Sequence, residues 1–400
     1  MNPTISSNLA SVLPEAAALS ATRKARLPWY CYAVALGATS ILIGIVWDIS
    51  WHSTIGRDTF WTPAHMAIHL GGILGGLSCG WLVLRATVGP DSAERAASVR
   101  LWGFRGPLGA WVTIWGALAM LTSAPFDNWW HEAYGLDVEI LSPPHSVLAA
   151  GMYLLVAGAL LLLLSEQNRS PAPAGAVPGS RLFLYIGGIM LCMCSIMVTE
   201  RSLAHQQHAA LFYKISAAQY PLLLVGLARA SKLRWPATTV ALVYTGLTCA
   251  AVWILPLFPA TPKLAPIYNP VTHMVPPQFP HLLVVPALAI DLWFRWLGRG
   301  HGAGRDWLLV VLIALSFVGL FILAQWHFAK FLISPAAENW FFAGNGFWPF
   351  YNSRGDHWHR FWRVTEDPLS AQAVGITVAL ALVSTRLGLW WGNWMARVRR

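Results

Sequence analysis

Long apolar segments recur along the whole chain and limit its possible folds more than any other feature of the sequence. Each is about 18–22 residues long, the length that an α-helix needs to cross the hydrocarbon layer of a membrane. The segments are 29–47, 65–86, 107–126, 145–165, 181–199, 209–229, 237–257, 278–297, 307–327 and 371–392. Because irregular backbone cannot face lipid, each segment is expected to be helical. The sequence therefore predicts an all-α, polytopic integral membrane protein with about ten transmembrane helices.

The composition supports this fold class and excludes a soluble domain. Of the 400 residues, 56% are hydrophobic and only 11% are charged, less than half the share of about 25% in soluble proteins. The formal net charge of +10 comes from Lys and Arg in every second loop and near both ends of the chain. This alternation is the positive-inside pattern, so both termini are expected on the cytoplasmic side of a bacterial-type inner membrane. The basic charge therefore indicates orientation in a lipid bilayer, and no nucleic-acid partner is expected.

Two copies of one motif join an aspartate to two histidines. The first copy reads DISWHSTIGRDTFWTPAH, in the pattern D-x3-H-x12-H, and the second reads DNWWHEAYGLDVEILSPPH, in the pattern D-x3-H-x13-H. The triads are Asp48, His52 and His65 in the first copy, and Asp127, His131 and His145 in the second. Residues four apart share one face of a helix, and the closing histidine follows a proline that fixes the start of the next helix. Each copy therefore predicts three ligands that converge between two neighbouring helices.

One carboxylate and two imidazoles form a metal site that leaves coordination positions open for a small molecule. This donor set suits copper, zinc or iron, whereas magnesium and calcium prefer mostly oxygen ligands. His69 is expected as an extra ligand or proton carrier, because it follows His65 by four residues on the same helix face. Arg57 and Asp58 are expected to orient the ligands of the first triad, and an ordinary loop ion pair is the open alternative.

A stretch rich in Pro, Gly, Ala and Ser at 166–180 divides the chain. A cytoplasmic tail at 1–28 and a four-helix unit at 29–165, which holds both motifs, come before it. A six-helix unit at 181–400 follows, with an outer loop at 328–370 that is rich in aromatic residues. The run GGILGG at 71–76 predicts close contact between its helix and a neighbour. The second unit repeats the motif only weakly, and its histidines are expected to lie at the membrane interface with local hydrogen bonds: His205, His208, His273 and His281.

The first motif resembles the C subunit of the copper membrane monooxygenases, the family of particulate methane monooxygenase and ammonia monooxygenase. The matching residues are Asp48, Ser50, Trp51, His52, Arg57, Asp58, Thr62, Pro63 and His65. The second motif resembles the second copper site of that subunit through Asp127, Trp129, His131, Pro143 and His145. The resemblance covers about residues 30–165. It implies two neighbouring metal sites at the outer ends of the helices, one or both of which activate dioxygen in the family.

The resemblance implies a copper-dependent membrane monooxygenase, or its metal-bearing subunit, that activates dioxygen to oxidise a small apolar substrate. The implied catalytic residues are Asp127, His131 and His145, and the implied supporting residues are Arg57, Asp58 and His69. Electrons would come from an external donor, because the sequence has no flavin, haem or iron–sulfur pattern. Partner subunits or a homo-oligomer are also expected. The chain departs from the family at Asp127, where the family has asparagine, so this site is expected to bind a divalent metal more tightly.

Two other functions stay open at this point. A metal-handling protein that captures or transports copper or zinc would need ligands through the depth of the bilayer. Nearly all histidines instead lie at the outer ends of the predicted helices. A structural partner with decayed sites would have lost ligands at random, whereas both triads are intact. The sequence therefore favours the oxygenase, with metal capture or transport as its alternative.

Overall fold

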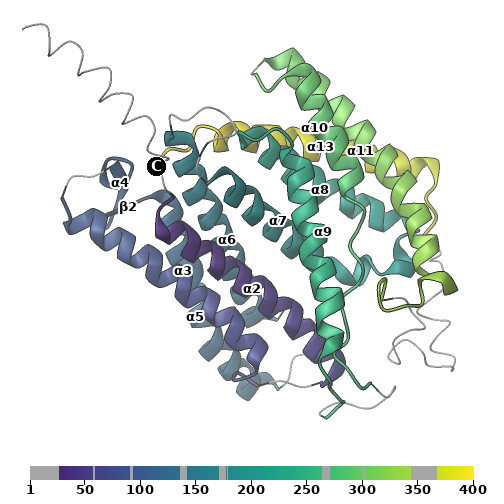
Figure 1. The fold of residues 1–400 in the computed structure, drawn as a ribbon, viewed down its shortest axis with the longest axis horizontal. Helices are drawn as coiled ribbons and strands as arrows, with labels where there is room; N and C mark the ends of the chain where they lie inside the picture. Colours follow the sequence, from purple (N-terminus) through teal and green to yellow (C-terminus); the bar gives the residue numbers. More distant parts are fainter. Residues whose placement is uncertain are drawn as a thin grey trace, which may run out of the picture.

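The structure, a computed structural model, contains ten helices of 14 residues or more in the part of the chain that it describes (Figure 1). It describes residues 27–56, 59–90, 93–135, 142–170, 177, 179–263, 271–300, 302–343 and 367–400. The first four helices are α2 (Trp29–Thr54), α3 (Pro63–Val88), α5 (Leu108–Tyr134) and α6 (Pro143–Arg169). The next six are α7 (Ser180–Ile196), α8 (Ala210–Ala230), α9 (Pro236–Ile254), α10 (Val284–Leu297), α11 (Ala303–Leu332) and α13 (Ala371–Met395). The predicted helical architecture is confirmed.

A small hairpin interrupts the helices between α3 and α5. Its two strands, β1 (Val99–Leu101) and β2 (Phe104–Gly106), pair antiparallel, and the short helix α4 (Ala93–Ala96) precedes them. Thr87 near the end of α3 holds the hairpin, because the Arg105 amide donates to the Thr87 hydroxyl at 2.8 Å. The remaining elements are short 3₁₀ turns at η1 (Thr199–Arg201), η2 (Ala204–Gln206), η3 (Leu255–Leu257) and η4 (Pro335–Ala337). None of these small elements was predicted from the sequence.

Eight of the described helices are long and apolar enough to cross a membrane, and the chain is an integral membrane protein. The exceptions are α7, with 17 residues, and α10, with 14 residues. The helices predicted at 181–199 and 278–297 were therefore too long. Residues 278–283 are not helical, because Pro276, Pro277 and Pro280 lack the amide proton that a helix needs and restrict the residues before them.

The irregular stretch before α10 is held by side chains instead of helical hydrogen bonds. The amide of His281 donates to the Tyr244 hydroxyl at 3.1 Å, and the amide of Leu282 donates to Oε1 of Gln325 at 2.8 Å. Both acceptor residues are buried, Tyr244 on α9 and Gln325 on α11. These main-chain amides thus find hydrogen-bond acceptors inside the protein, as non-helical backbone in a membrane protein must.

Two pairs of helices in the first unit approach to backbone contact. A Cβ on Gly37 of α2 would lie 2.9 Å from the Gly71 carbonyl oxygen of α3. A Cβ on Gly116 of α5 would lie 2.6 Å from the Gly151 carbonyl oxygen of α6. Only glycine leaves room for helices this close, and such contacts are common between transmembrane helices. The close contact that GGILGG predicted is confirmed at Gly71.

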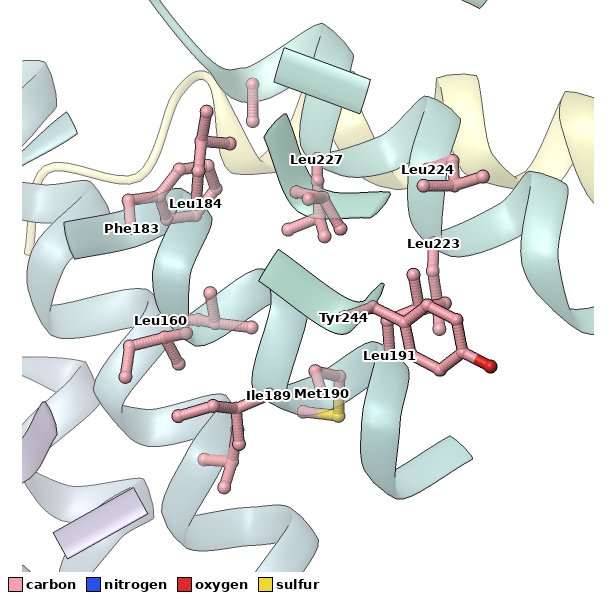
Figure 2. Packing of buried hydrophobic residues seen from close by; sticks show 14 of the residues in the cluster. Leu160, Phe183, Leu184, Ile189, Met190, Leu191, Leu223, Leu224, Leu227 and Tyr244 are labelled. Carbon is pink, nitrogen blue, oxygen red and sulfur yellow. The ribbon is translucent and has the colours of Figure 1, made fainter. Parts of the chain in front are cut away.

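The four-helix and six-helix units share one hydrophobic core. Figure 2 shows where side chains of α6, α7, α8 and α9 meet, at Leu160, Phe183, Leu184, Ile189, Met190, Leu191, Leu223, Leu224, Leu227 and Tyr244. The end of α6 also joins the units, because Nε2 of Gln167 donates to the Ala230 carbonyl oxygen at 2.9 Å. Helix α6 continues through Arg169, so the first residues of the expected linker at 166–180 are helical.

Candidate metal centres

The first triad forms where α2 ends and α3 begins. Asp48 and His52 lie near the end of α2, and His65 lies in the first turn of α3. Nε2 of His65 is 3.2 Å from Oδ1 of Asp48, and Nε2 of His52 is 3.9 Å from Oδ2. Pro63 is the first residue of α3, where its fixed φ starts the helix. The structure therefore brings the three predicted residues together around one carboxylate.

The second triad repeats this arrangement where α5 ends and α6 begins. Nε2 of His131 is 3.5 Å from Oδ1 of Asp127, and Nε2 of His145 is 3.6 Å from the same oxygen. The His145 amide donates to the Ser142 hydroxyl at 3.4 Å, which caps α6 and holds the closing histidine in the first turn. Side chains in the two triads are between 23% and 52% exposed. Both triads are therefore open to water or to a small ligand.

The glycine contacts occupy equivalent places in the two helix pairs. Gly37 and Gly116 each precede the aspartate of their own triad by eleven residues. Their partners, Gly71 and Gly151, each follow the closing histidine by six residues. Because the helices touch at the same distance from each triad, the imidazole on the second helix reaches the carboxylate on the first in both pairs. The sequence repeat is thus also a repeat of structure.

Both triads lie at the same end of the four-helix unit. A Cβ on Gly72 of α3 would lie 3.3 Å from Met120 of α5, and a Cβ on Gly76 would lie 2.9 Å from Ala117. Residue numbers therefore rise along α3 as they fall along α5, and the two helices are antiparallel. The start of α3 lies beside the end of α5, and helices α2, α3, α5 and α6 lie together in the purple and blue part of Figure 1.

A main-chain carbonyl fixes the orientation of one histidine in each triad. Nδ1 of His65 lies 3.0 Å from the Thr59 carbonyl oxygen, and Nδ1 of His131 lies 3.0 Å from the Gly135 carbonyl oxygen. A carbonyl oxygen only accepts, so Nδ1 carries the proton in both rings. In a ring with this single proton, Nε2 presents a lone pair toward the aspartate. Histidines that bind a metal through Nε2 commonly use Nδ1 in this way.

One carboxylate oxygen in each triad has no hydrogen bond. Oδ1 of Asp48 and Oδ1 of Asp127 are both buried and lack a hydrogen-bond partner. An unprotonated Nε2 and a carboxylate oxygen are both acceptors, so separations of 3.2 Å and 3.5 Å call for a positive charge near them, either a proton or a metal ion. Two ligands about 2 Å from one metal ion at a tetrahedral angle are about 3.3 Å apart, which is close to these separations.

The triads nevertheless do not close on a common point. Within the described ranges, no group of three His, Cys, Asp or Glu side chains is arranged to hold a metal ion as it stands. The longest carboxylate–imidazole distance is the 3.9 Å between His52 and Asp48, and His52 is also the most exposed of the six side chains, at 52%. The donor types and the buried Oδ1 atoms fit a transition metal. Completing either site requires rotation of the exposed imidazoles.

Three other residues were expected to take part in the first site. His69 lies one turn after His65 on α3, where its ring centroid is 5.2 Å from that of Phe60. Among the described residues, the ion pairs of Asp48 are with His52 and His65, so His69 is beside the triad and is not paired with its carboxylate. Arg57 and Asp58 lie outside the described residues, and their supporting role stays a prediction.

The sequence alone did not single out Ser50 and Thr54 as supporting residues. They alternate with Asp48 and His52 on α2, on the opposite face of the helix. Both are buried, and both hydroxyls donate to main-chain carbonyl oxygens. A hydroxyl two positions from a predicted ligand is the signal that could have indicated a contact behind the site.

Histidines of the second unit lie in hydrogen-bonded surroundings. Nδ1 of His281 is 3.1 Å from the Tyr220 hydroxyl, and Nε2 of His208 is 3.2 Å from the Trp326 carbonyl oxygen. Burial lowers the pKa of His205 and of His208, so both imidazoles are uncharged at neutral pH. These histidines therefore contribute to packing and to local hydrogen bonds.

No protein-family model, curated protein or solved structure matches this chain. Its function is therefore inferred from the two triads and from the residues around them.

Proposed function

We propose that the chain is a copper-dependent membrane monooxygenase, or the metal-bearing subunit of one, which activates dioxygen to oxidise a small apolar substrate. The observation that carries the proposal is the buried aspartate oxygen of each triad, which faces an imidazole Nε2 and has no hydrogen bond. A bound transition metal would supply the positive charge that these acceptors need. Two imidazoles and one carboxylate favour copper, and zinc and iron are the other metals that suit this donor set.

The second triad is the proposed catalytic centre. Asp127, His131 and His145 would hold the metal between the end of α5 and the start of α6. Bound copper would supply the redox chemistry that activates dioxygen for attack on a C–H or N–H bond. Asp127 contributes negative charge, and the Gly135 carbonyl oxygen keeps the His131 ring in position. The first triad would hold a second metal ion at Asp48, His52 and His65.

Aromatic rings beside the second triad favour an apolar substrate. Trp130 and Tyr134 follow Asp127 and His131 on one face of α5, and their ring centroids are 4.5 Å apart. Large rings of this kind cover apolar surface and displace water from a site. An external donor must supply electrons, and partner subunits or further copies of the chain would complete the enzyme.

The distribution of Lys and Arg supports an inner-membrane protein whose triads face the periplasm. Arg169 is at the end of α6 and Arg229 is near the end of α8, and Lys232 donates to the Gln167 carbonyl oxygen at 2.8 Å. These cations gather at the end of α6 that lies away from His145. The positive-inside rule assigns this end to the cytoplasm.

Metal analysis of the purified protein tests the proposal. We expect copper at both triads, with one ion lost in His65→Ala and the other lost in His145→Ala. Copper-dependent consumption of dioxygen with a short alkane is expected in the native protein and absent in His145→Ala. A folded protein that binds no transition metal after purification with copper would contradict the proposal.

A metal-handling protein that captures or transports copper or zinc is the second candidate. The exposure of the His52 and His145 side chains, 52% and 40%, favours it, because exposed ligands can exchange metal with the surrounding water. Proteoliposomes distinguish the two functions. Entry of copper or zinc without dioxygen consumption would support metal handling, whereas substrate oxidation without metal entry would support the oxygenase.

A further inference from the structure

A segment of the second unit lies behind the first triad. Residues 258–263 follow η3, and residues 271–275 pair with them in an antiparallel arrangement that we call the α9–α10 ladder. In this ladder, the Ala260 amide donates to the Thr272 carbonyl oxygen at 3.0 Å. The Met274 amide donates to the Phe258 carbonyl oxygen, also at 3.0 Å. The hydrogen bonds of the ladder therefore fix the position of the main chain at Val275.

Three hydrogen bonds join the α9–α10 ladder to the end of α2. The Ser50 hydroxyl donates to the Val275 carbonyl oxygen at 2.6 Å, and the Val275 amide donates to the Thr54 hydroxyl at 2.8 Å. The Lys263 amide donates to the Ile55 carbonyl oxygen at 3.0 Å, directly after the helix. Ser50, Thr54 and Val275 are at most 4% exposed, so water competes little for the two hydroxyl bonds.

These contacts hold the face of α2 that is opposite to the triad. Ser50 and Thr54 each follow a triad residue by two positions, which is about 200° around the helix. The carboxylate of Asp48 and the imidazole of His52 therefore project from a turn whose other face is tied to the second unit. Rotation or fraying of this turn would move both side chains.

The end of α5 lacks the groups that make these contacts. The positions that correspond to Ser50 and Thr54 in the second motif are Trp129 and Ala133, and neither has a hydroxyl. The side-chain hydrogen bond described between Asn128 and Glu132, at 2.8 Å, stays within the helix. The support is therefore a feature of the first triad and not of the repeated motif.

We propose that the α9–α10 ladder positions the first metal centre, with Ser50 and Thr54 as positioning residues. The proposal rests on the proposed function only in treating the first triad as a metal centre. The six-helix unit thereby sets the geometry of the first centre, through contacts for which the end of α5 has no matching hydroxyls.

Removal of the Thr54 hydroxyl tests this role with divalent copper as the probe. Thr54→Val keeps the shape of the side chain and leaves the Val275 amide without its acceptor. A His145→Ala background limits copper to the first triad. We expect copper to bind about 10-fold more weakly, the lower end of the loss when a direct partner of a ligand is removed, because Thr54 acts only through the position of the helix turn. The copper EPR spectrum should change as well, and Thr54→Ser, which keeps the hydroxyl, should restore both.

Two controls make the comparison specific. Thr245→Val on α9 removes a hydroxyl that donates to the Ala241 carbonyl oxygen within its own helix, and copper binding should not change. A His65→Ala background limits copper to the second triad, and Thr54→Val should not change copper binding there. Unchanged affinity and spectrum of the first triad in both Thr54→Val and Ser50→Ala would overturn the proposal.

Hydrogen–deuterium exchange separates this proposal from the proposed function. Thr54→Val should speed exchange of the amides at 52–56 with or without copper, because the ladder no longer holds the end of α2. If neither background binds copper, the metal proposal fails and the exchange rates alone decide the positioning role. Equal rates in the native protein and in Thr54→Val would then overturn it.

Discussion

Gly116 and Gly151 touch through their backbones, and this contact sets how far the imidazole of His145 reaches toward Asp127. A Cβ on Gly116 would lie 2.6 Å from the Gly151 carbonyl oxygen, closer than carbon and oxygen approach without strain. Helices α5 and α6 would have to separate to accept it. The carboxylate on α5 and the imidazole on α6, now 3.6 Å apart, would then move away from each other.

Gly116→Ala is therefore expected to weaken both the fold and the second centre. The added methyl group should cost about 1–3 kcal/mol of stability, which is usual for overpacking. Copper binding in a His65→Ala background should weaken in parallel. Thermal unfolding in detergent and a copper titration measure the two effects. Gly246→Ala on α9 is the control, since nothing lies within 4 Å of a Cβ added there. Equal stability and equal copper affinity in the two variants would show that the Gly116–Gly151 contact does not position the second triad.

Loss of either histidine at the second triad should abolish substrate oxidation. His131→Ala and His145→Ala each remove a proposed ligand, and both side chains are partly exposed, so the fold should persist. Turnover of a short alkane by copper-loaded protein measures the effect, with circular dichroism as the check on folding. His327→Ala, at an exposed position on α11, should retain turnover. Full turnover in His131→Ala would remove the second triad from the mechanism.

Asp127→Asn tests the charge at the second centre. Asparagine offers a neutral oxygen, whereas the aspartate carries a negative charge that stabilises a divalent metal over a monovalent one. We expect Asp127→Asn to weaken divalent copper binding and to raise the reduction potential of bound copper. Titration and potentiometry of both proteins, at one pH and in one detergent, measure the two changes. If neither quantity moves, Asp127 is not a ligand.

The ion pair between Arg229 and Asp306 should be important for stability at the opposite end of the protein. Nη2 of Arg229 donates to Oδ1 of Asp306 at 3.1 Å, and the two side chains are only 1% and 11% exposed. Asp306→Asn leaves the guanidinium charge buried without its counter-ion, which should cost about 3–5 kcal/mol. Thermal unfolding measures this loss against Glu338→Gln, at an exposed position. Equal midpoints would show that Arg229 is neutralised by other groups.

The apolar segments predicted where the helices lie, but not how long each would be. Hydropathy continues through residues 278–283, yet Pro276, Pro277 and Pro280 prevent a helix there. Similarly, Met197 and Val198 extend the apolar run beyond α7, yet the helix ends at Ile196 and the 3₁₀ turn η1 follows from Thr199. Length of an apolar run reports burial in lipid or protein, whereas the end of a helix depends on local hydrogen bonding.

The spacing of the motifs predicted the triads, because Asp and His four residues apart must share a helix face and the next helix returns nearby. It could not predict the support behind the first triad. Ser50 and Val275 are 225 residues apart in the chain, and no local pattern connects them. The orientation of the His65 and His131 rings was also beyond the sequence, since it depends on the carbonyl oxygens of Thr59 and Gly135.

The irregular stretch before α10 has a consequence for the order in which the chain enters the membrane. Its amides at His281 and Leu282 depend on acceptors from α9 and α11, so the stretch has no satisfied state of its own in lipid. Gln325, the acceptor for Leu282, lies on α11 and is synthesised only after the whole of α10. We therefore expect α10 to remain at the insertion machinery until α11 has been made, so that the two helices enter the bilayer together.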